Sequence, residues 1–209
     1  MGIVLEQIQQ MVKLKILLVG ILIMQLNSSC SEKFVTTEMK NNFTAAQIDD
    51  LKKIRDFFEN QICDSNDDNF KNCFSEMLPE LIEFGWQPIL DKVDYNRQKK
   101  LYESISLSTF NEIWEFQKIT YPKSENELKS IASKYNGAYQ KYLTELGEKN
   151  SQIKKYAEQI ISAGAFESMG LLQQNIYKNP NEFDLNDANI QLLISVHYLT
   201  QNDQQKRNE

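Results

Sequence analysis

Apolar side chains recur every three to four residues through most of the chain from Thr44 onward, which is the spacing of one face of an α-helix. Thr44 with Gln47, and Ser124 with Glu127, match the capping box, a pair whose side chains bond to free backbone N–H groups where a helix begins. A half-buried β-strand needs alternating apolar and polar residues, and no such alternation in this sequence runs beyond a few positions. The spacing therefore predicts an all-α fold.

Composition supports this prediction. The chain has 209 residues, of which 41% are hydrophobic and 11% aromatic, but only 7 are glycine and 4 are proline. This apolar content excludes a disordered chain, and the scarcity of glycine and proline disfavours a turn-rich β-sandwich. We expect one compact bundle of about seven to nine short helices, irregular rather than a simple four-helix bundle. We assign the helical domain to residues 43–200 and a disordered polar tail to residues 201–209.

Breaks in the apolar spacing predict where individual helices begin and end. Pro79 predicts a break between two helices, because proline lacks the backbone N–H that continues a helix. The capping box at Ser124 predicts a helix that continues to Gly147. A last helix is expected from about Asn186 to Thr200.

The N-terminal segment has the layout of a signal peptide. Lys13 and Lys15 precede an apolar run of nine residues, 16–24. A nine-residue helix is about 14 Å long, too short for a hydrocarbon core of about 30 Å. Residues 1–29 are therefore interpreted as a signal peptide, with Met11 as the favoured translation start.

The end of this segment, Leu26-Asn27-Ser28-Ser29-Cys30, resembles the lipobox of bacterial lipoprotein precursors. In that family the cysteine is acylated and the chain is cut just before it. The family pattern usually has leucine three residues before the cysteine, a place that Asn27 takes here. The resemblance covers this segment alone and implies that Cys30 is lipidated.

The resemblance also implies a location. An acylated cysteine, carrying chains such as palmitate, would hold the protein on the outer or inner membrane of the bacterial envelope, facing the periplasm or the cell surface. Residues 30–42 are polar and are expected to form a tether that reaches up to about 40 Å. Ordinary secretion with cleavage near Ser29, or an uncleaved anchor, are the alternatives.

Cys63 and Cys73 remain once Cys30 is set aside, and two cysteines in an exported chain predict one disulfide. It would close a loop of 11 residues and stabilise the fold by about 3 kcal/mol. Free thiols are the alternative. A zinc site is disfavoured, because the chain has one histidine and no pair of cysteines with two residues between them.

The loop between these cysteines is rich in aspartate and asparagine. Asp64, Asn66 and Asp68 fall at the first, third and fifth positions of a calcium-binding EF-hand loop. Its twelfth position, where a bidentate glutamate belongs, is Ser75. We therefore expect a turn and an N-cap for the next helix rather than a calcium site.

The sequence lacks the residue patterns of common enzymes. His197 is the only histidine, and we expect it to be half-buried and hydrogen-bonded on an amphipathic helix rather than catalytic. Neither a nucleophile elbow nor a phosphate-binding glycine loop is present. Carboxylate pairs such as Glu112 with Glu115, or Glu80 with Glu83, could serve a glycosidase, but solvated helix faces explain them better.

Charge and cofactor patterns limit the partners. The formal net charge is -6, so nucleic acid is not expected as a partner. No cofactor and no metal is expected. The protein is more plausibly a non-enzyme.

Tyr135, Tyr139 and Tyr142 are spaced by four and three residues and would share one stripe of a helix. Core packing explains such a stripe, and a ligand groove or a protein interface is the alternative. The leading functional hypothesis is a membrane-tethered, non-enzymatic binding, accessory or immunity-type module that contacts an envelope protein. The alternative is a carboxylate-dependent cell-wall or glycan hydrolase.

Overall fold

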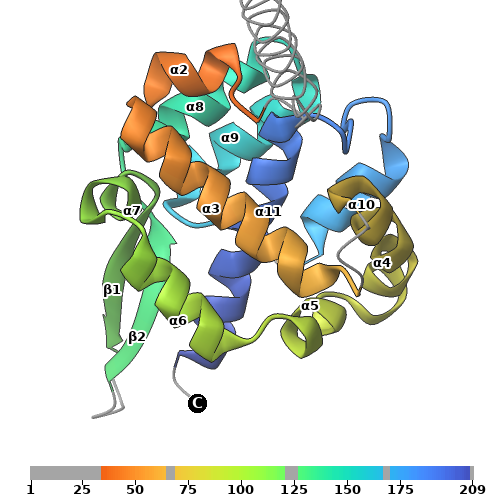
Figure 1. Cartoon of the computed structure of the whole chain (residues 1–209), viewed down its shortest axis with the longest axis horizontal. Coiled ribbons are helices and arrows are strands. Elements are labelled where there is room, and N and C mark those ends of the chain that lie inside the picture. Colours follow the sequence, from red (N-terminus) through yellow and green to blue (C-terminus); the bar gives the residue numbers. More distant parts are fainter. Residues whose placement is uncertain (1–33, 65–68, 121–126, 167–169, 208–209) are drawn as a thin grey trace, which may run out of the picture. The chain divides into compact units, whose positions relative to one another are not determined.

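The computed structural model describes residues 34–64, 69–120, 127–166 and 170–207. This part of the chain has ten helices and one sheet of two strands (Figure 1). The prediction of an irregular, mostly helical bundle is confirmed, with slightly more helices than expected. The elements are α2 (Thr37–Asn42), α3 (Ala45–Ile62), α4 (Phe70–Phe84), α5 (Gln87–Lys92), α6 (Tyr95–Ser104), α7 (Leu107–Ile113), β1 (Trp114–Thr120), β2 (Glu127–Ser133), α8 (Ala138–Gly147), α9 (Ser151–Ala163), α10 (Leu171–Lys178) and α11 (Ala188–Lys206).

Helix α11 is the centre of the fold. Each residue from Asn189 to Asp203 is buried, on every side of the helix. Helix α3 crosses it on one side, and α6, α5 and β2 also contact it (Figure 1). Because a helix surrounded in this way has no solvent face, its sequence carries no simple amphipathic stripe.

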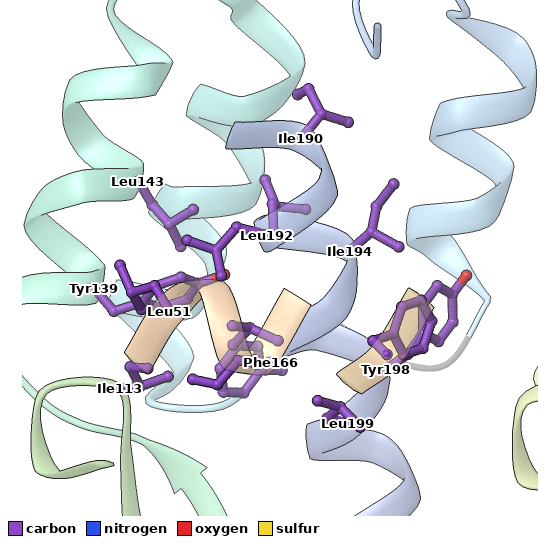
Figure 2. Packing of buried hydrophobic residues seen from close by; sticks show 14 of the residues in the cluster. Leu51, Ile113, Tyr139, Leu143, Phe166, Ile190, Leu192, Ile194, Tyr198 and Leu199 are labelled. Carbon is purple, nitrogen blue, oxygen red and sulfur yellow. The ribbon is translucent and has the colours of Figure 1, made fainter. Parts of the chain in front are cut away.

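The apolar core gathers around this central helix. Leu192, Ile194 and Leu199 of α11 are fully buried, together with Leu51 of α3 and Leu143 of α8 (Figure 2). Burial of a leucine or isoleucine side chain contributes about 1.5–3 kcal/mol relative to exposure. The elements that surround α11 are therefore held mainly by the removal of its apolar side chains from water.

Polar side chains of α11 are buried as well, and most of them are hydrogen-bonded. The indole N–H of Trp114 donates to Thr200 Oγ1 at 2.8 Å. The amide of Gln98 donates to the carbonyl of Leu199 at 2.7 Å and accepts from Asn202 Nδ2 at 2.7 Å. These bonds fix β1 and α6 against the central helix, since a buried polar group left without a partner is destabilising by about 1–3 kcal/mol.

Local capping signals mark the starts of several helices. The capping box of Thr44 and Gln47 is formed at the start of α3. Asn69 caps α4 through its side-chain oxygen, as expected for the end of the cysteine loop, and Asp94 caps α6. Gly85 ends α4 at φ +69°, a conformation that residues with a Cβ rarely adopt.

The helix predicted from Ser124 to Gly147 is wrong in its first half. Residues 127–133 form β2, which pairs antiparallel with β1, so that Trp114 lies opposite Ser133 and Phe116 opposite Ile131. Helix α8 begins only at Ala138. The apolar residues after the second capping pair have helical spacing, but Ile131 is buried through long-range pairing with β1, which local spacing cannot reveal.

The predicted break at Pro79 is also wrong, because α4 continues through this proline. Pro79 cannot donate a hydrogen bond to the carbonyl of Ser75. Both residues are exposed, so water can bond to that carbonyl. The packing of Phe74, Met77 and Leu81 on the buried face keeps the helix continuous.

The domain extends beyond the expected limits at both ends. Its first described residue, Phe34, is buried, and α2 follows, so the tether predicted for residues 30–42 is largely part of the fold. At the other end α11 runs to Lys206, and the disordered tail expected at 201–209 is a helix over most of its length. Gln201 and Asp203 are buried there, because α6 and the strands cover this end of the helix.

Candidate functional site

A groove between α4 and α10 is the candidate site. It has a volume of about 430 Å³ and is open to solvent. One wall comes from α4, the other from the end of α10, and the loop that leads to α11 supplies the remaining lining residues. The lining residues are Lys71, Ser75, Leu78, Ile176, Tyr177, Pro180, Phe183, Asp184 and Leu185.

The floor of the groove is apolar and its rim is charged. Ile176 and Phe183 are almost fully buried, while Tyr177 is 58% exposed. Lys71 and Asp184 are exposed at the rim. Such an apolar floor with few polar groups is suited to apolar side chains or a small apolar molecule.

The disulfide predicted between Cys63 and Cys73 is present and holds the α4 wall. Its two Cα atoms are 5.2 Å apart, and it joins the residue that follows α3 to the first turn of α4. In addition, Glu59 Oε1 accepts a 2.6 Å hydrogen bond from the backbone N–H of Phe70. The start of α4, which carries Lys71, is therefore fixed to the end of α3.

Gln173 holds the α10 wall. Its side chain is buried, donates to the carbonyl of Leu81 on α4 at 3.0 Å, and accepts from the hydroxyl of Tyr198 on α11 at 3.1 Å. Both bonds are buried, and each would leave a polar group unpaired if it were lost. The distance between the two walls is thus set by hydrogen bonds as well as by apolar packing.

The structure separates the three tyrosines that the sequence places on one stripe. Tyr139 and Tyr142 are fully buried, and the Tyr142 hydroxyl donates to Asn189 Oδ1 at 2.9 Å. Burial raises the pKa of both phenols above the usual value. Tyr135 lies in the turn before α8 and is 64% exposed. The core explanation therefore holds for Tyr139 and Tyr142, and the three do not form one surface.

His197 is a buried structural residue. Its Nδ1 lies 3.1 Å from the hydroxyl of Tyr156, and its Nε2 lies 2.8 Å from Gln201 Nε2. Burial lowers its pKa to about 3, so the ring is neutral at pH 7. The hydrogen bonding expected for this histidine is present, and its burial is complete rather than partial.

Glu112 and Glu115, one of the carboxylate pairs considered in the sequence, both serve as structural partners. Glu112 Oε2 accepts from the backbone N–H of Ala138 at 2.6 Å, at the start of α8. Glu115 Oε2 lies 3.0 Å from Lys134 Nζ. Each carboxylate therefore has its own basic or N–H partner rather than sharing a cleft with the other.

A smaller cavity beside the disulfide carries several acidic residues. It has a volume of about 210 Å³ and is lined in part by Asp64, Glu76, Glu80 and Lys92. Glu76 and Glu80 are one turn apart on α4 and therefore lie on the same wall of the cavity. Asp64 Oδ1 forms an ion pair with Lys92 Nζ at 2.8 Å. Within the described ranges, no group of three or more histidine, cysteine or carboxylate side chains could hold a metal ion. Residues 65–68, which belong to the loop compared with an EF-hand, lie outside the described residues.

The sequence does not predict the groove, because its two walls, α4 and α10, are about a hundred residues apart in the chain. A signal was available after α10, where Phe183 and Leu185 stand as isolated apolar residues in a polar loop. Cys30 and the signal peptide lie outside the described residues. In the part of the chain that the structure describes, no helix combines the length and hydropathy needed to cross a bilayer.

No protein-family model matches the chain, and no curated protein or solved structure matches it either. The function is therefore inferred from the chemistry of this chain alone.

Proposed function

We propose that this protein is a membrane-tethered, non-enzymatic binding module of the bacterial cell envelope. Its groove between α4 and α10 receives apolar side chains of an envelope protein. The observation that carries the proposal is the exposed Tyr177 beside the buried floor residues Ile176 and Phe183. The tether is the acylated Cys30 that the lipobox-like segment implies.

The chemistry of the groove supports binding to a protein. Tyrosine is among the residues that contribute most to interfaces, because it offers a large apolar area with a polar tip. Lys71 and Asp184 at the rim can pair with charges of either sign on a partner. A partner segment that fits this groove would carry one or two apolar residues flanked by charged residues.

Rigid walls also support binding. The disulfide and the hydrogen bonds of Gln173 hold α4 and α10 before any partner arrives. A preformed groove loses less conformational entropy on binding than a flexible one. This arrangement suits an accessory or immunity-type protein whose only task is to hold its partner.

The hydrolase alternative gains no support from the carboxylates at hand. A glycosidase requires two carboxyl groups on opposite sides of a bound sugar. Glu76 and Glu80 lie on one helix, and Glu112 and Glu115 are each engaged elsewhere. We therefore propose only the binding module.

Site-specific crosslinking in the native host tests the proposal. A photoreactive p-benzoylphenylalanine replaces Tyr177 in a C-terminally tagged chain, and the same replacement of Tyr135 serves as the control, because both tyrosines are well exposed. We expect one envelope protein to be crosslinked in stoichiometric yield from position 177 and not from 135. Equal products from the two positions would contradict the groove as the binding site.

Two further variants test the other parts of the proposal. Tyr177→Ala in an otherwise natural chain should reduce copurification of the same partner, while Tyr135→Ala should not. Cys30→Ala should release the protein from the membrane fraction. If Cys30→Ala and the natural chain fractionate alike, the lipid anchor is wrong.

A further inference from the structure

The first described residues are fixed to the domain from Phe34 onward. Phe34 is 4% exposed, and the guanidinium carbon of Arg55 lies 5.2 Å from the centre of its ring. Arg55 itself is buried and pairs with Glu59 at 3.1 Å. Phe34 is therefore part of the core rather than of a linker.

The residues that follow Phe34 are held at several more points. Thr36 Oγ1 donates to Asn189 Oδ1 at 2.7 Å, and Glu38 Oε1 lies 2.9 Å from Lys149 Nζ. Asn42 Nδ2 donates to Glu145 Oε2 at 2.6 Å. Helix α2 is thus attached to α11 and to the end of α8.

The chain between Cys30 and Phe34 is consequently very short. Four residue steps span at most about 14 Å, even when fully extended. The tether expected from the sequence ended at Asn42 and would have spanned about 40 Å. The fold removes most of that length.

This short connection limits how the domain can turn on a membrane. A domain of this size has a radius of gyration of about 16 Å, which corresponds to a diameter of about 40 Å. Consider a sphere of that diameter, joined to a flat membrane by a linker of about 14 Å that is attached at Phe34. Only surface points within about 70° of Phe34, measured from the centre of the sphere, can touch the membrane. With a tether of about 40 Å any side could touch it.

Helix α11 shows which side lies opposite the attachment point. Its first turn contains Asn189, the partner of Thr36. At its other end the guanidinium of Arg207 lies 4.4 Å from the ring centre of Phe116 on β1. These positions are eighteen residues apart, or about 27 Å of helix. Figure 1 shows α2 and the hairpin of β1 and β2 at opposite ends of the domain.

We infer that the lipid bilayer faces the α2 end of the domain, residues 34–42, and that the hairpin of β1 and β2 points away from it. This inference rests on the proposed lipid anchor at Cys30. The surface near the hairpin, including the exposed Phe116, is then always presented to the aqueous side. Partners that approach from that side meet the hairpin first.

Energy transfer from the protein to the bilayer tests this orientation. The lipidated mature chain, which begins at Cys30, is purified from host membranes and placed in phosphatidylcholine vesicles that carry an acceptor dye on the lipid headgroups. A donor dye is attached through p-azidophenylalanine at Lys40 or at Gln117, which avoids the cysteines. Both residues are exposed, Lys40 on α2 and Gln117 on β1. Several-fold stronger transfer is expected from position 40 than from position 117.

A spacer variant and an anchor variant separate the possible outcomes. Insertion of about twelve glycine and serine residues between Lys33 and Phe34 should bring the two transfer efficiencies close together, because the domain can then turn freely. Equal transfer from both positions without the spacer would overturn the orientation and leave the anchor standing. If the natural chain binds vesicles no better than Cys30→Ala, the anchor fails and the orientation fails with it.

Discussion

The hydroxyl of Thr36 donates a 2.7 Å hydrogen bond to the side-chain oxygen of Asn189, 153 positions later in the chain. The same oxygen accepts from the Tyr142 hydroxyl at 2.9 Å. Asn189 therefore joins the start of α2, α8 and the first turn of α11 at one buried point. This junction makes residues 34–42 part of the domain.

Replacement of Asn189 by leucine should destabilise the protein by about 2–4 kcal/mol. The change leaves the Tyr142 hydroxyl buried without its acceptor and removes the acceptor of Thr36. Urea denaturation followed by circular dichroism measures the loss as a lower midpoint with an unchanged slope.

Tyr142→Phe is the matched control, because it removes the donor instead of the acceptor. The double variant Asn189→Leu with Tyr142→Phe should be more stable than the sum of the two single losses predicts. Strict additivity would mean that the two side chains do not act together.

Local chemistry determines the features that the sequence predicts well. The cap of α3 involves Thr44 and Gln47 within one turn, and the disulfide joins cysteines ten positions apart. Both depend on neighbours along the chain. Their presence in the fold follows from short-range hydrogen bonding and from the small loop that the disulfide closes.

The features that the sequence could not predict depend on distant partners. Ile131 belongs to a strand because β1 pairs with it, and Gln98 is buried because Leu199 and Asn202 bond to its amide. Considered alone, Ile131 suits the apolar face of a helix, and Gln98 suits an exposed helix position. The groove is missed for the same reason, since Tyr177 becomes part of a site only when α10 packs beside α4.

Loss of the disulfide should destabilise the fold by about 3 kcal/mol. The double variant Cys63→Ser with Cys73→Ser frees an unfolded-state loop of 11 residues that the disulfide otherwise closes. Chemical denaturation of the natural and double-variant proteins measures the difference. Reduction of the natural protein should lower its midpoint by a similar amount and leave the double variant unchanged. A midpoint that is insensitive to both changes would contradict a stabilising role.

His197 should make the protein less stable in mild acid. Burial lowers its folded-state pKa from 6.5 to about 3, so the unfolded chain binds a proton more readily than the folded protein. Above pH 6.5 His197 is mainly neutral in both the folded and the unfolded protein, and it does not lower the free energy of unfolding. That free energy then falls progressively as the pH drops toward 3, because the unfolded chain is protonated first. Between pH 7.5 and pH 5 the free energy of unfolding should fall by about 2 kcal/mol from this residue alone.

Comparison with His197→Gln isolates this effect. The variant lacks the titrating ring, so its stability should change less over the same pH range, even if its absolute stability is lower. Asp50 does not interfere in this range. Burial opposes ionisation of Asp50, but hydrogen bonds from Lys53, Ser106 and Thr109 outweigh it and lower the pKa to about 2. Parallel stability curves for the two proteins between pH 7.5 and pH 5 would show that His197 does not titrate as argued.

Gln173 should control the rigidity of the groove. Gln173→Leu removes the bond to the Leu81 carbonyl and leaves the Tyr198 hydroxyl buried without its acceptor. We expect a global loss of about 1–3 kcal/mol and a larger local effect, seen as faster amide hydrogen exchange in α10 and at the end of α4 than in α8 or α9.

The same variant links groove rigidity to binding. A less ordered α10 must lose more conformational entropy when a partner is bound, so the yield of crosslinking from position 177 should fall. Asn189→Leu is the control, because it destabilises the fold at the α2 end without touching either groove wall. If both variants lower the crosslinking yield in proportion to their global stability, Gln173 has no specific role in the groove. A fall confined to Gln173→Leu would identify its two hydrogen bonds as the contacts that keep the groove ready for its partner.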